Sequence, residues 1–311
     1  MNDNFTNTPN SIDTAGYEKA FWSAMKNNNN AYNELINGRQ TTQTYLPPYK
    51  TGKKYMDAIA EKNIFRKIAT AVSAPRSDND IFTSNCNDFA EWVSGNWYNV
   101  KEDYADFEKY RVTCHKLAVI TRLDNDFVYD TGFDIEDYLV NRFAKIFGRA
   151  EENAFINGSG ENMPKGILHE AEGAETGVTV SDTITFDDIV KLYFSVKKEY
   201  RTYGVWLMND ETAFILRSMK DTNGNYIWNH STDTILGKPV YVSEFMPYVN
   251  SGNKPIAFGD FSYYYIVDRC PLSVRALQEK YALEQQTGYL AYEQLDGMLV
   301  RPEAIKLISI A

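Results

Sequence analysis

The sequence has few of the features that identify secreted, membrane-spanning or metal-binding proteins. Its three cysteines, Cys86, Cys114 and Cys270, are far apart and lack a C-x-x-C spacing, which predicts neither a disulfide framework nor a zinc site. No run of about 18 apolar residues occurs, and the polar start has neither the basic nor the apolar region of a signal peptide. We therefore expect a soluble protein made in the cytoplasm, with no membrane partner.

Positive charge is also scarce. Lysine and arginine number 32 against 42 aspartates and glutamates, so the formal net charge is -10. Because phosphate binding needs clustered cations, this balance argues against nucleic acid as a direct ligand. It does not exclude a container, since an acidic wall repels enclosed DNA rather than trapping it.

No catalytic motif is present. The histidines His115, His169 and His230 are too far apart in the sequence for a local metal motif. Closely spaced carboxylates are more often helix caps or solvated faces than acid-base pairs. They occur at Asp124/Asp126, Glu151/Glu152 and Asp187/Asp188. The G-S-G at Gly158 fits neither a dinucleotide fingerprint nor a phosphate loop, and no G-x-S-x-G occurs, so we predict no catalytic residue, cofactor or metal.

Aromatic residues, in contrast, are abundant. The 311 residues include 22 tyrosines and 17 phenylalanines, which suit extensive interfaces. A hydrophobic fraction of 43% is typical of a globular protein, and the length allows one large domain or two.

Residues 1–46 are rich in Asn and Thr yet carry aromatics, among them Phe21 and Trp22. A short helix is expected from about Gly16 to Lys26, because its apolar residues recur at helical spacing. The rest of the segment has little to pack against within its own chain. We interpret residues 1–46 as an arm that becomes ordered on a neighbouring subunit; an unstructured terminus is the alternative.

Phe107 to Leu123 alternates polar and apolar residues at its start, which predicts one strand of about 55 Å, far longer than usual. Paired with part of Ile81–Val93 across a polar tip, it forms an extended two-stranded loop. Trp92 and Trp97 lie in this loop. A lone hairpin is marginal in water, so another copy is expected to cover it.

The remaining pattern predicts an α+β protein. A long amphipathic helix covers Ile135–Ile156, with Asp134 as its cap and Gly158 closing it in a left-handed conformation. Thr185 and Asp188 form a capping box before a second helix. The other expected elements are helices at Met56–Lys67, Phe186–Thr202 and Asp210–Lys220, strands at Val205–Met208, near Val240, near Ile256 and at Leu299–Ile310, and a turn at Asn223-Gly224.

Four segments taken in order resemble the major capsid proteins of tailed phages, which have the Hong Kong 97-type fold. They are GSGENMPKGIL (Gly158–Leu168), LRSMKDTNGNYIW (Leu216–Trp228), LGKPVYVSEFMP (Leu236–Pro247) and IAFGDFSYYYIVDR (Ile256–Arg269). The resemblance covers about Ile135 to Ala311, more than half of the chain. It implies an N-terminal arm, an extended β-hairpin loop, a peripheral domain with a long spine helix, and an axial domain.

The resemblance implies seven segments along the chain. These are the arm (1–46), part of the peripheral domain (47–78), the extended loop (79–115), the peripheral domain with its spine helix (116–165), the axial domain (166–276), the peripheral return (277–302) and the axial end (303–311). The residues expected to matter for assembly are Phe21, Trp22, Trp92, Trp97, Lys109, Gly158, Pro164 and Gly166.

Two family features are expected to differ here. Some members join subunits through a loop lysine and an asparagine; Lys109 matches the lysine, but Gln285 and Gln286 stand where the asparagine should be, which argues against cross-linking. Many members also carry an N-terminal scaffolding segment that a protease removes. Either this is a processed form or a separate scaffold protein is used, and Met1 favours the second.

We therefore predict a structural protein, not an enzyme, that self-assembles as hexamers and pentamers into a virion shell around double-stranded DNA. Scaffold, portal and decoration proteins are further expected partners, and the DNA is enclosed without sequence-specific binding. The alternatives are an encapsulin-like bacterial compartment and a soluble α+β enzyme.

Overall fold

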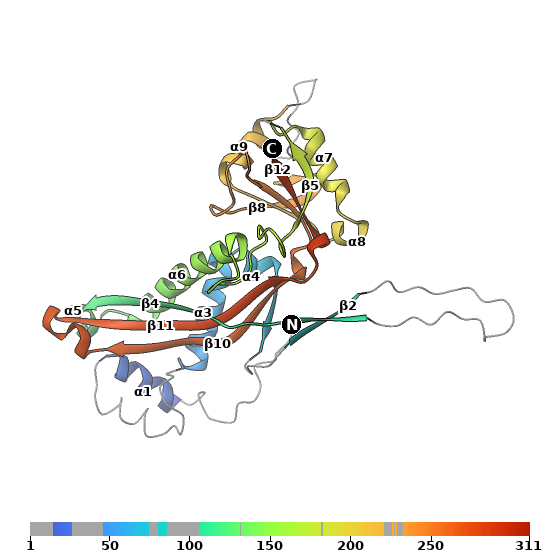
Figure 1. Cartoon of the computed structure of the whole chain (residues 1–311). Helices are drawn as coiled ribbons and strands as arrows, with labels where there is room; N and C mark the ends of the chain where they lie inside the picture. Colours follow the sequence, from blue (N-terminus) through green and yellow to red (C-terminus); the bar gives the residue numbers. More distant parts are fainter. Residues whose placement is uncertain are drawn as a thin grey trace, which may run out of the picture.

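The computed structural model describes residues 15–26, 46–74, 80–85, 106–130, 132–181, 183–220, 226, 228 and 233–311. These residues form two lobes and a projecting hairpin. In Figure 1 the lobe with the C-terminus lies above the other lobe, and the hairpin points away from both to the right. The helices and strands confirm the expected α+β class.

The first lobe is built on a four-stranded sheet in the order β1-β10-β11-β4. Its centre is the antiparallel pair β10 (Tyr264–Leu277) and β11 (Gln286–Leu299), each 14 residues long and joined by η3 (Glu279–Glu284). A register shift between Asp268 and Ser273 bends this pair. The edges are β1 (Thr70–Ser73), which is parallel to β10, and β4 (His115–Asp124), which is antiparallel to β11.

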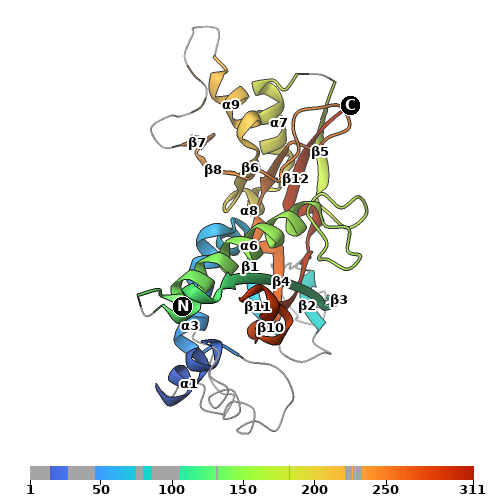
Figure 2. The same cartoon turned by 90° about the vertical axis from the view of Figure 1, so that its left-hand side faces the viewer.

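Helices α3 (Tyr49–Lys62) and α6 (Ile135–Asn157) lie on the same side of this sheet (Figure 2). The 23-residue α6 is the predicted long helix, and the carboxylate of Asp134 accepts a hydrogen bond from the Asp137 N–H, as expected of a cap. Two short helices, α4 (Phe65–Ile68) and α5 (Asn125–Tyr129), complete the lobe with α1 (Ala15–Met25). Its core is apolar and includes Phe143, Phe147 and Tyr289.

The second lobe contains a six-stranded sheet in the order β5-β12-β9-β6-β8-β7. Its strands are β5 (Glu175–Val180), β6 (Val205–Met208), β7 (Thr234–Ile235), β8 (Lys238–Val242), β9 (Ile256–Gly259) and β12 (Ile305–Ile310). Its helices are α7 (Phe186–Ser195), α8 (Lys198–Arg201) and α9 (Asp210–Ser218), with short turns η2 (Phe261–Tyr263) and η4 (Pro302–Ala304) beside the other lobe. The capping box of Thr185 and Asp188 is present as predicted.

The projecting hairpin consists of β2 (Asp80–Asn85) paired antiparallel with β3 (Asp106–Arg111). The expected single strand from Phe107 to Leu123 is wrong. The strand breaks at residues 112–114, and β4 then pairs with β11 in the first lobe. Because one half of the alternating segment has its partner in the hairpin and the other half in the lobe, the chain must change direction between them.

Other expected boundaries also differ. The helix predicted at Met56–Lys67 is two helices, broken at Asn63 and Ile64; the one predicted at Phe186–Thr202 is broken at Val196 and Lys197. The C-terminal strand begins only at Ile305. Strand β10 falls within the segment 166–276 assigned to the axial domain, but it pairs in the sheet of the first lobe. The Asn223-Gly224 turn lies outside the described residues.

Candidate functional site

The first two predicted assembly residues, Phe21 and Trp22, lie on α1 and pack on their own chain. Phe21 is fully buried in the core of the first lobe, and Trp22 meets its ring edge-on with 5.2 Å between centroids. The hydroxyl of Tyr289 donates to the Met25 carbonyl at 3.0 Å and ties α1 to β11. Substitutions at Phe21 therefore affect folding before they affect assembly.

The residues predicted in the extended loop fall into two groups. Trp92 and Trp97 lie outside the described residues. Lys109 is an exposed residue of β3, and its ammonium pairs with the Asp80 carboxylate on β2 at 2.6 Å. Gln285 and Gln286, considered for cross-linking, lie where η3 meets β11, at the far end of the first lobe from the hairpin (Figure 1).

Gly158, Pro164 and Gly166 come together in a tight turn after α6. Gly158 has a φ of -63° and ψ of 137°, so the expected left-handed conformation is wrong. Glycine is required instead by close approach, because a Cβ there would lie 2.1 Å from the Pro164 carbonyl oxygen. A Cβ at Gly166 would lie 2.4 Å from the Ile156 oxygen. The turn thus folds back on the end of α6 without room for side chains.

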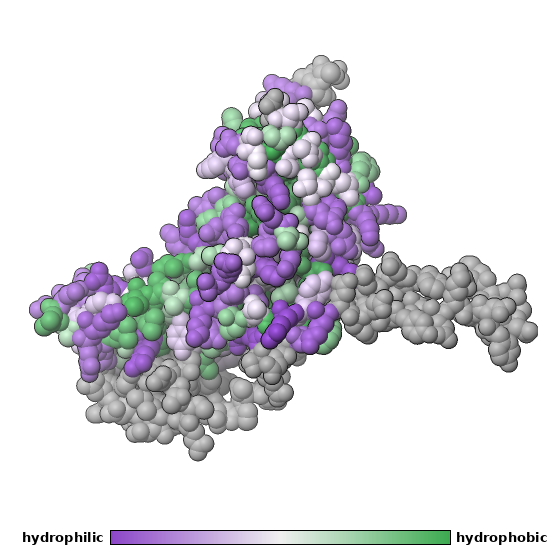
Figure 3. All heavy atoms as spheres, viewed as in Figure 1, coloured by the Kyte–Doolittle hydropathy of each residue, from purple (hydrophilic) through white to green (hydrophobic). Residues whose placement is uncertain are grey.

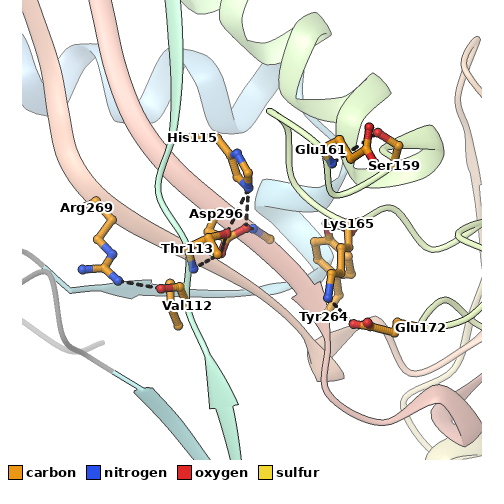
Figure 4. Close-up of polar contacts among 11 residues, drawn as sticks. Val112, Thr113, His115, Ser159, Glu161, Lys165, Glu172, Tyr264, Arg269 and Asp296 are labelled. Carbon is orange, nitrogen blue, oxygen red and sulfur yellow. Dashed lines mark hydrogen bonds and ion pairs between the residues drawn. The ribbon is translucent and has the colours of Figure 1, made fainter.

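Hydrogen bonds join this turn to the first-lobe sheet, and Figure 4 shows Lys165 beside Tyr264 of β10. The N–H of Lys165 donates to the Gly297 carbonyl at 3.0 Å, and the Tyr264 hydroxyl donates to the Lys165 carbonyl at 2.7 Å. The ammonium of Lys165 also pairs with Glu172. Since residues 169–174 lead into β5, the turn is one of the chain's connections between the two lobes, beside those from β9 to β10 and from β11 to β12.

The residue next to Gly297, Asp296, holds the base of the hairpin. Its Oδ2 accepts from the Thr113 N–H at 2.6 Å and from the Thr113 hydroxyl at 2.8 Å. Nε2 of His115 lies 3.0 Å from the same hydroxyl and 3.6 Å from Asp296 Oδ1 (Figure 4). These residue types occur in hydrolase triads, but here the carboxylate binds the hydroxyl directly and does not orient the far ring nitrogen. The arrangement is a structural contact between hairpin and lobe.

A buried ionic cluster lies between α3, α4, α6 and the sheet. The guanidinium of Arg66 donates to both oxygens of Glu151, at 3.0 and 2.6 Å, and to both oxygens of Asp268, at 2.7 and 2.9 Å. Nearby, the Tyr55 hydroxyl donates to Glu293 at 2.8 Å. Burial, together with the neighbouring Glu151 charge, raises the pKa of Glu293 well above its ordinary value.

A second buried carboxylate, Glu152, connects the two lobes. It accepts from the Ile64 N–H at 3.0 Å and from the hydroxyl of Ser243, which follows β8 of the second lobe. Burial raises the pKa of Glu152, although both hydrogen bonds oppose the shift. Glu151 and Glu152 are therefore neither helix caps nor solvated, as was expected of them, but buried hydrogen-bond acceptors inside α6.

Several exposed apolar side chains were not singled out from the sequence. At the end of the first lobe, Phe127 and Tyr129 of α5 are half exposed or more, and Leu283 of η3 is fully exposed. On the second lobe, Phe194 of α7 and Phe214 of α9 are 64% and 71% exposed. Figure 3 shows hydrophobic residues gathered over the first lobe near the start of α6 and β4. Such residues are candidates for subunit contacts.

A signal for the two phenylalanines was present in the helix spacing. The buried residues of α7 include Ile189 and Leu192, and Phe194 lies off that stripe. Phe214 likewise lies off the stripe formed by Ala213 and Leu216. Large apolar residues on the polar side of an amphipathic helix indicate an interface.

Within the described ranges, no group of three or more His, Cys, Asp or Glu side chains could hold a metal ion. No helix in the part of the chain that the structure covers is long and apolar enough to cross a membrane.

A hollow of about 340 Å³ lies where the hairpin meets the first lobe. It is lined by Val72, Ala74, Ile81, Phe82, Val112 and Val267, among others.

Comparison with known proteins gives a consistent result. The model of the phage capsid family matches residues 43–310. The capsid of a native GTA particle is 27% identical, with a TM-score of 0.66 over 88% of this chain and 95% of that chain. The capsid of an empty GTA particle is also 27% identical, with a TM-score of 0.69 over 88% and 94%. A chain from Gordonia phage Cozz, 12% identical, shares the fold with a TM-score of 0.58 over 80% and 87%. No curated protein matches the sequence.

Proposed function

The chain belongs to the phage capsid family and is a structural protein of a virion shell, and from this premise we propose that it assembles as hexamers and pentamers around double-stranded DNA. The observation that carries the proposal is the family match over residues 43–310. The projecting hairpin and the exposed apolar side chains of both lobes support it, because a two-stranded hairpin away from the core and apolar side chains in contact with water are typical of surfaces that a neighbouring subunit covers.

Each part of the molecule has a role in this proposal. The first lobe, with α6 as its spine, is the peripheral domain, and the second lobe is the axial domain that surrounds the capsomer axis. The hairpin binds neighbouring subunits, as does the arm of residues 1–46 apart from its helix α1, which packs on its own chain. Each contact is modest, but many copies close into one object, so weak contacts sum to a stable shell. The capsid structures similar to this chain favour a phage shell over an encapsulin-like compartment.

Exposed apolar residues at the two ends of the molecule supply a specific test. Leu283→Asp removes a fully exposed apolar side chain from η3 and adds a charge. Ala282→Asp adds the same charge to the same exposed turn without removing a large apolar group. We expect Leu283→Asp to prevent closed shells while the unfolding temperature of the subunit stays unchanged, and Ala282→Asp to assemble.

The experiment is to express each full chain, separate species by size-exclusion chromatography and image them by negative-stain electron microscopy. Closed shells or capsomer rings from the unmodified chain would support assembly without other phage proteins. A uniform monomer or dimer would require co-expression with scaffold and portal proteins, which are the other proposed partners. A particle population that Leu283→Asp leaves unchanged would remove η3 from the proposed contacts.

A further inference from the structure

The connection between the hairpin and the first lobe buries little apolar surface. Its apolar cluster contains only three buried residues among the described ranges, Ala74, Val112 and Val267. Beside it, the hollow of about 340 Å³ separates Phe82 of the hairpin from Val72 of β1. Close packing fixes a side chain in one arrangement, and a hollow of this size lacks that constraint. Apolar packing alone therefore does not fix the angle between hairpin and lobe.

Polar contacts supply the missing constraint: the hydroxyl of Tyr110 on β3 donates to the Val300 carbonyl at 2.8 Å, and the other contacts meet at residues 112–115. The carboxylate of Asp296 binds both the N–H and the hydroxyl of Thr113, at 2.6 and 2.8 Å. The guanidinium of Arg269 donates to the Val112 carbonyl at 3.0 Å. Asp296 and Arg269 belong to β11 and β10, so both contacts attach the break between β3 and β4 to the central strands of the sheet.

Asp296 is itself held rigidly. It is only 3% exposed, and its Oδ1 accepts from the Gly297 N–H at 2.8 Å. The carbonyl of Gly297 accepts from Lys165 in the turn after α6. The same short piece of β11 thus holds the hairpin on one side and the connection to the second lobe on the other (Figure 4). A charged acceptor that is fixed in this way makes strong hydrogen bonds.

We propose that Asp296 is the positioning residue that sets the angle of the β2-β3 hairpin to the first lobe, and that this angle lets the hairpin reach a neighbouring subunit. The importance of the angle for assembly rests on the proposed function. The contact between Asp296 and Thr113, called the clamp below, does not rest on it, because both residues belong to one chain.

The clamp can be measured by hydrogen exchange on the unassembled full-length subunit. In the unmodified protein the Thr113 amide donates to a buried carboxylate and is protected. Asp296→Ala should speed exchange in peptides that cover residues 112–115 by about tenfold or more, the factor expected for loss of one charge-assisted hydrogen bond. Exchange in α6 and in the rest of β10 and β11 should not change.

Two further variants keep the test decisive. Thr113→Val removes the hydroxyl contact and leaves the carboxylate in place, so it tests the proposal if Asp296→Ala does not fold. We expect Thr113→Val to raise the exchange rate in the same peptides, but by less than Asp296→Ala does. Glu284→Ala is the control, because it removes a carboxylate bound to Arg122 at 2.8 Å at the other end of the same sheet. It should leave residues 112–115 unchanged.

The particles formed by each variant complete the experiment. Faster exchange confined to residues 112–115, together with open or irregular shells, would support the proposal. Unchanged exchange, faster exchange throughout the lobe, or normal shells despite a released clamp would each overturn it. If the unmodified chain forms no shells under any condition, the proposed function fails, while the exchange data still test the clamp.

Discussion

Removal of Arg66 should destabilise the subunit far more than removal of any exposed cation. The side chain of Arg66 is 4% exposed, and that of its partner Glu151 is fully buried. Four hydrogen bonds join the guanidinium to Glu151 and Asp268. In Arg66→Met the methionine fills much of the space, but Glu151 keeps a buried charge whose remaining hydrogen bond comes from the Asn63 amide at 2.9 Å.

The magnitude follows from this uncompensated charge. Loss of one partner from a buried pair typically costs about 3–5 kcal/mol, whereas an exposed pair contributes roughly 0–1 kcal/mol. Asp268 is 27% exposed and can be hydrated, so most of the loss arises at Glu151. We expect Arg66→Met to lower the free energy of unfolding by about 3–5 kcal/mol. The double variant Arg66→Met/Glu151→Gln should recover part of it, because the charge is gone.

Urea unfolding of the unassembled subunit, followed by circular dichroism, measures these differences. Arg122→Met is the matched control, since Arg122 pairs with Glu284 at 2.8 Å but both side chains are more than half exposed. It should lose less than about 1 kcal/mol. If Arg66→Met were no less stable than this control, or if adding Glu151→Gln made it worse, the reasoning about the buried charge would be refuted.

Three further predictions test the core, the turn and a buried acid. Phe65→Ala should lower the free energy of unfolding by about 3–5 kcal/mol, because Phe65 is fully buried against Phe155, Phe261 and Tyr264. Urea unfolding measures this difference, and a decrease of less than about 1 kcal/mol would contradict the prediction. Gly158→Ala should lower the unfolding temperature by several degrees, since the Cβ of the new alanine would lie 2.1 Å from the Pro164 carbonyl oxygen. An unchanged melting curve would contradict this, because the turn would then accommodate the methyl group with no loss of stability. Burial raises the pKa of Glu293 in the folded state, so the carboxyl favours folding while it is protonated, and its contribution to the free energy of unfolding should fall as pH rises above the ordinary value of 4.5. Glu293→Gln should reduce this fall between pH 5 and pH 8, and equal urea midpoint shifts in both proteins would contradict the assignment.

Much of the fold was predictable because local patterns and tertiary packing agree. The long helix at Ile135–Asn157 has both a capping aspartate and a regular apolar stripe, and its limits were predicted within one residue. The capping box at Thr185 and the buried strand Val205–Met208 were also correct. In each case the residues that form the element also determine what it packs against.

The errors occurred where a contact distant in the sequence decides the local structure. The segment from Phe107 to Leu123 was expected to be one strand, but β11 pairs with only its second half and Asp296 holds the break. The alternation of polar and apolar residues stops at His115 and Lys116, but alternation does not show which strand each half pairs with. Gly158 was expected to adopt a left-handed conformation, whereas the carbonyl of Pro164, six residues later, excludes a side chain there. The pairing of β10 with β11, which moves residues 264–277 into the first lobe, is likewise a long-range contact.

The predicted assembly residues illustrate the same limit. Gly158, Pro164 and Gly166 meet in one turn within a single subunit. Phe21 lies in the core of its own chain, because a helix stripe shows that a face is buried without showing by which subunit. The exposed Leu283 was not selected, since a single apolar residue in a short helix gives no periodic signal.

Cryo-electron microscopy of the assembled particles would show whether the chain builds a shell through contacts between subunits. We expect closed particles in which the β2-β3 hairpin lies on a neighbouring subunit and the second lobes meet around each capsomer axis. Particles whose hairpins contact only their own chain, or a small oligomer that never closes even with scaffold and portal proteins present, would contradict it.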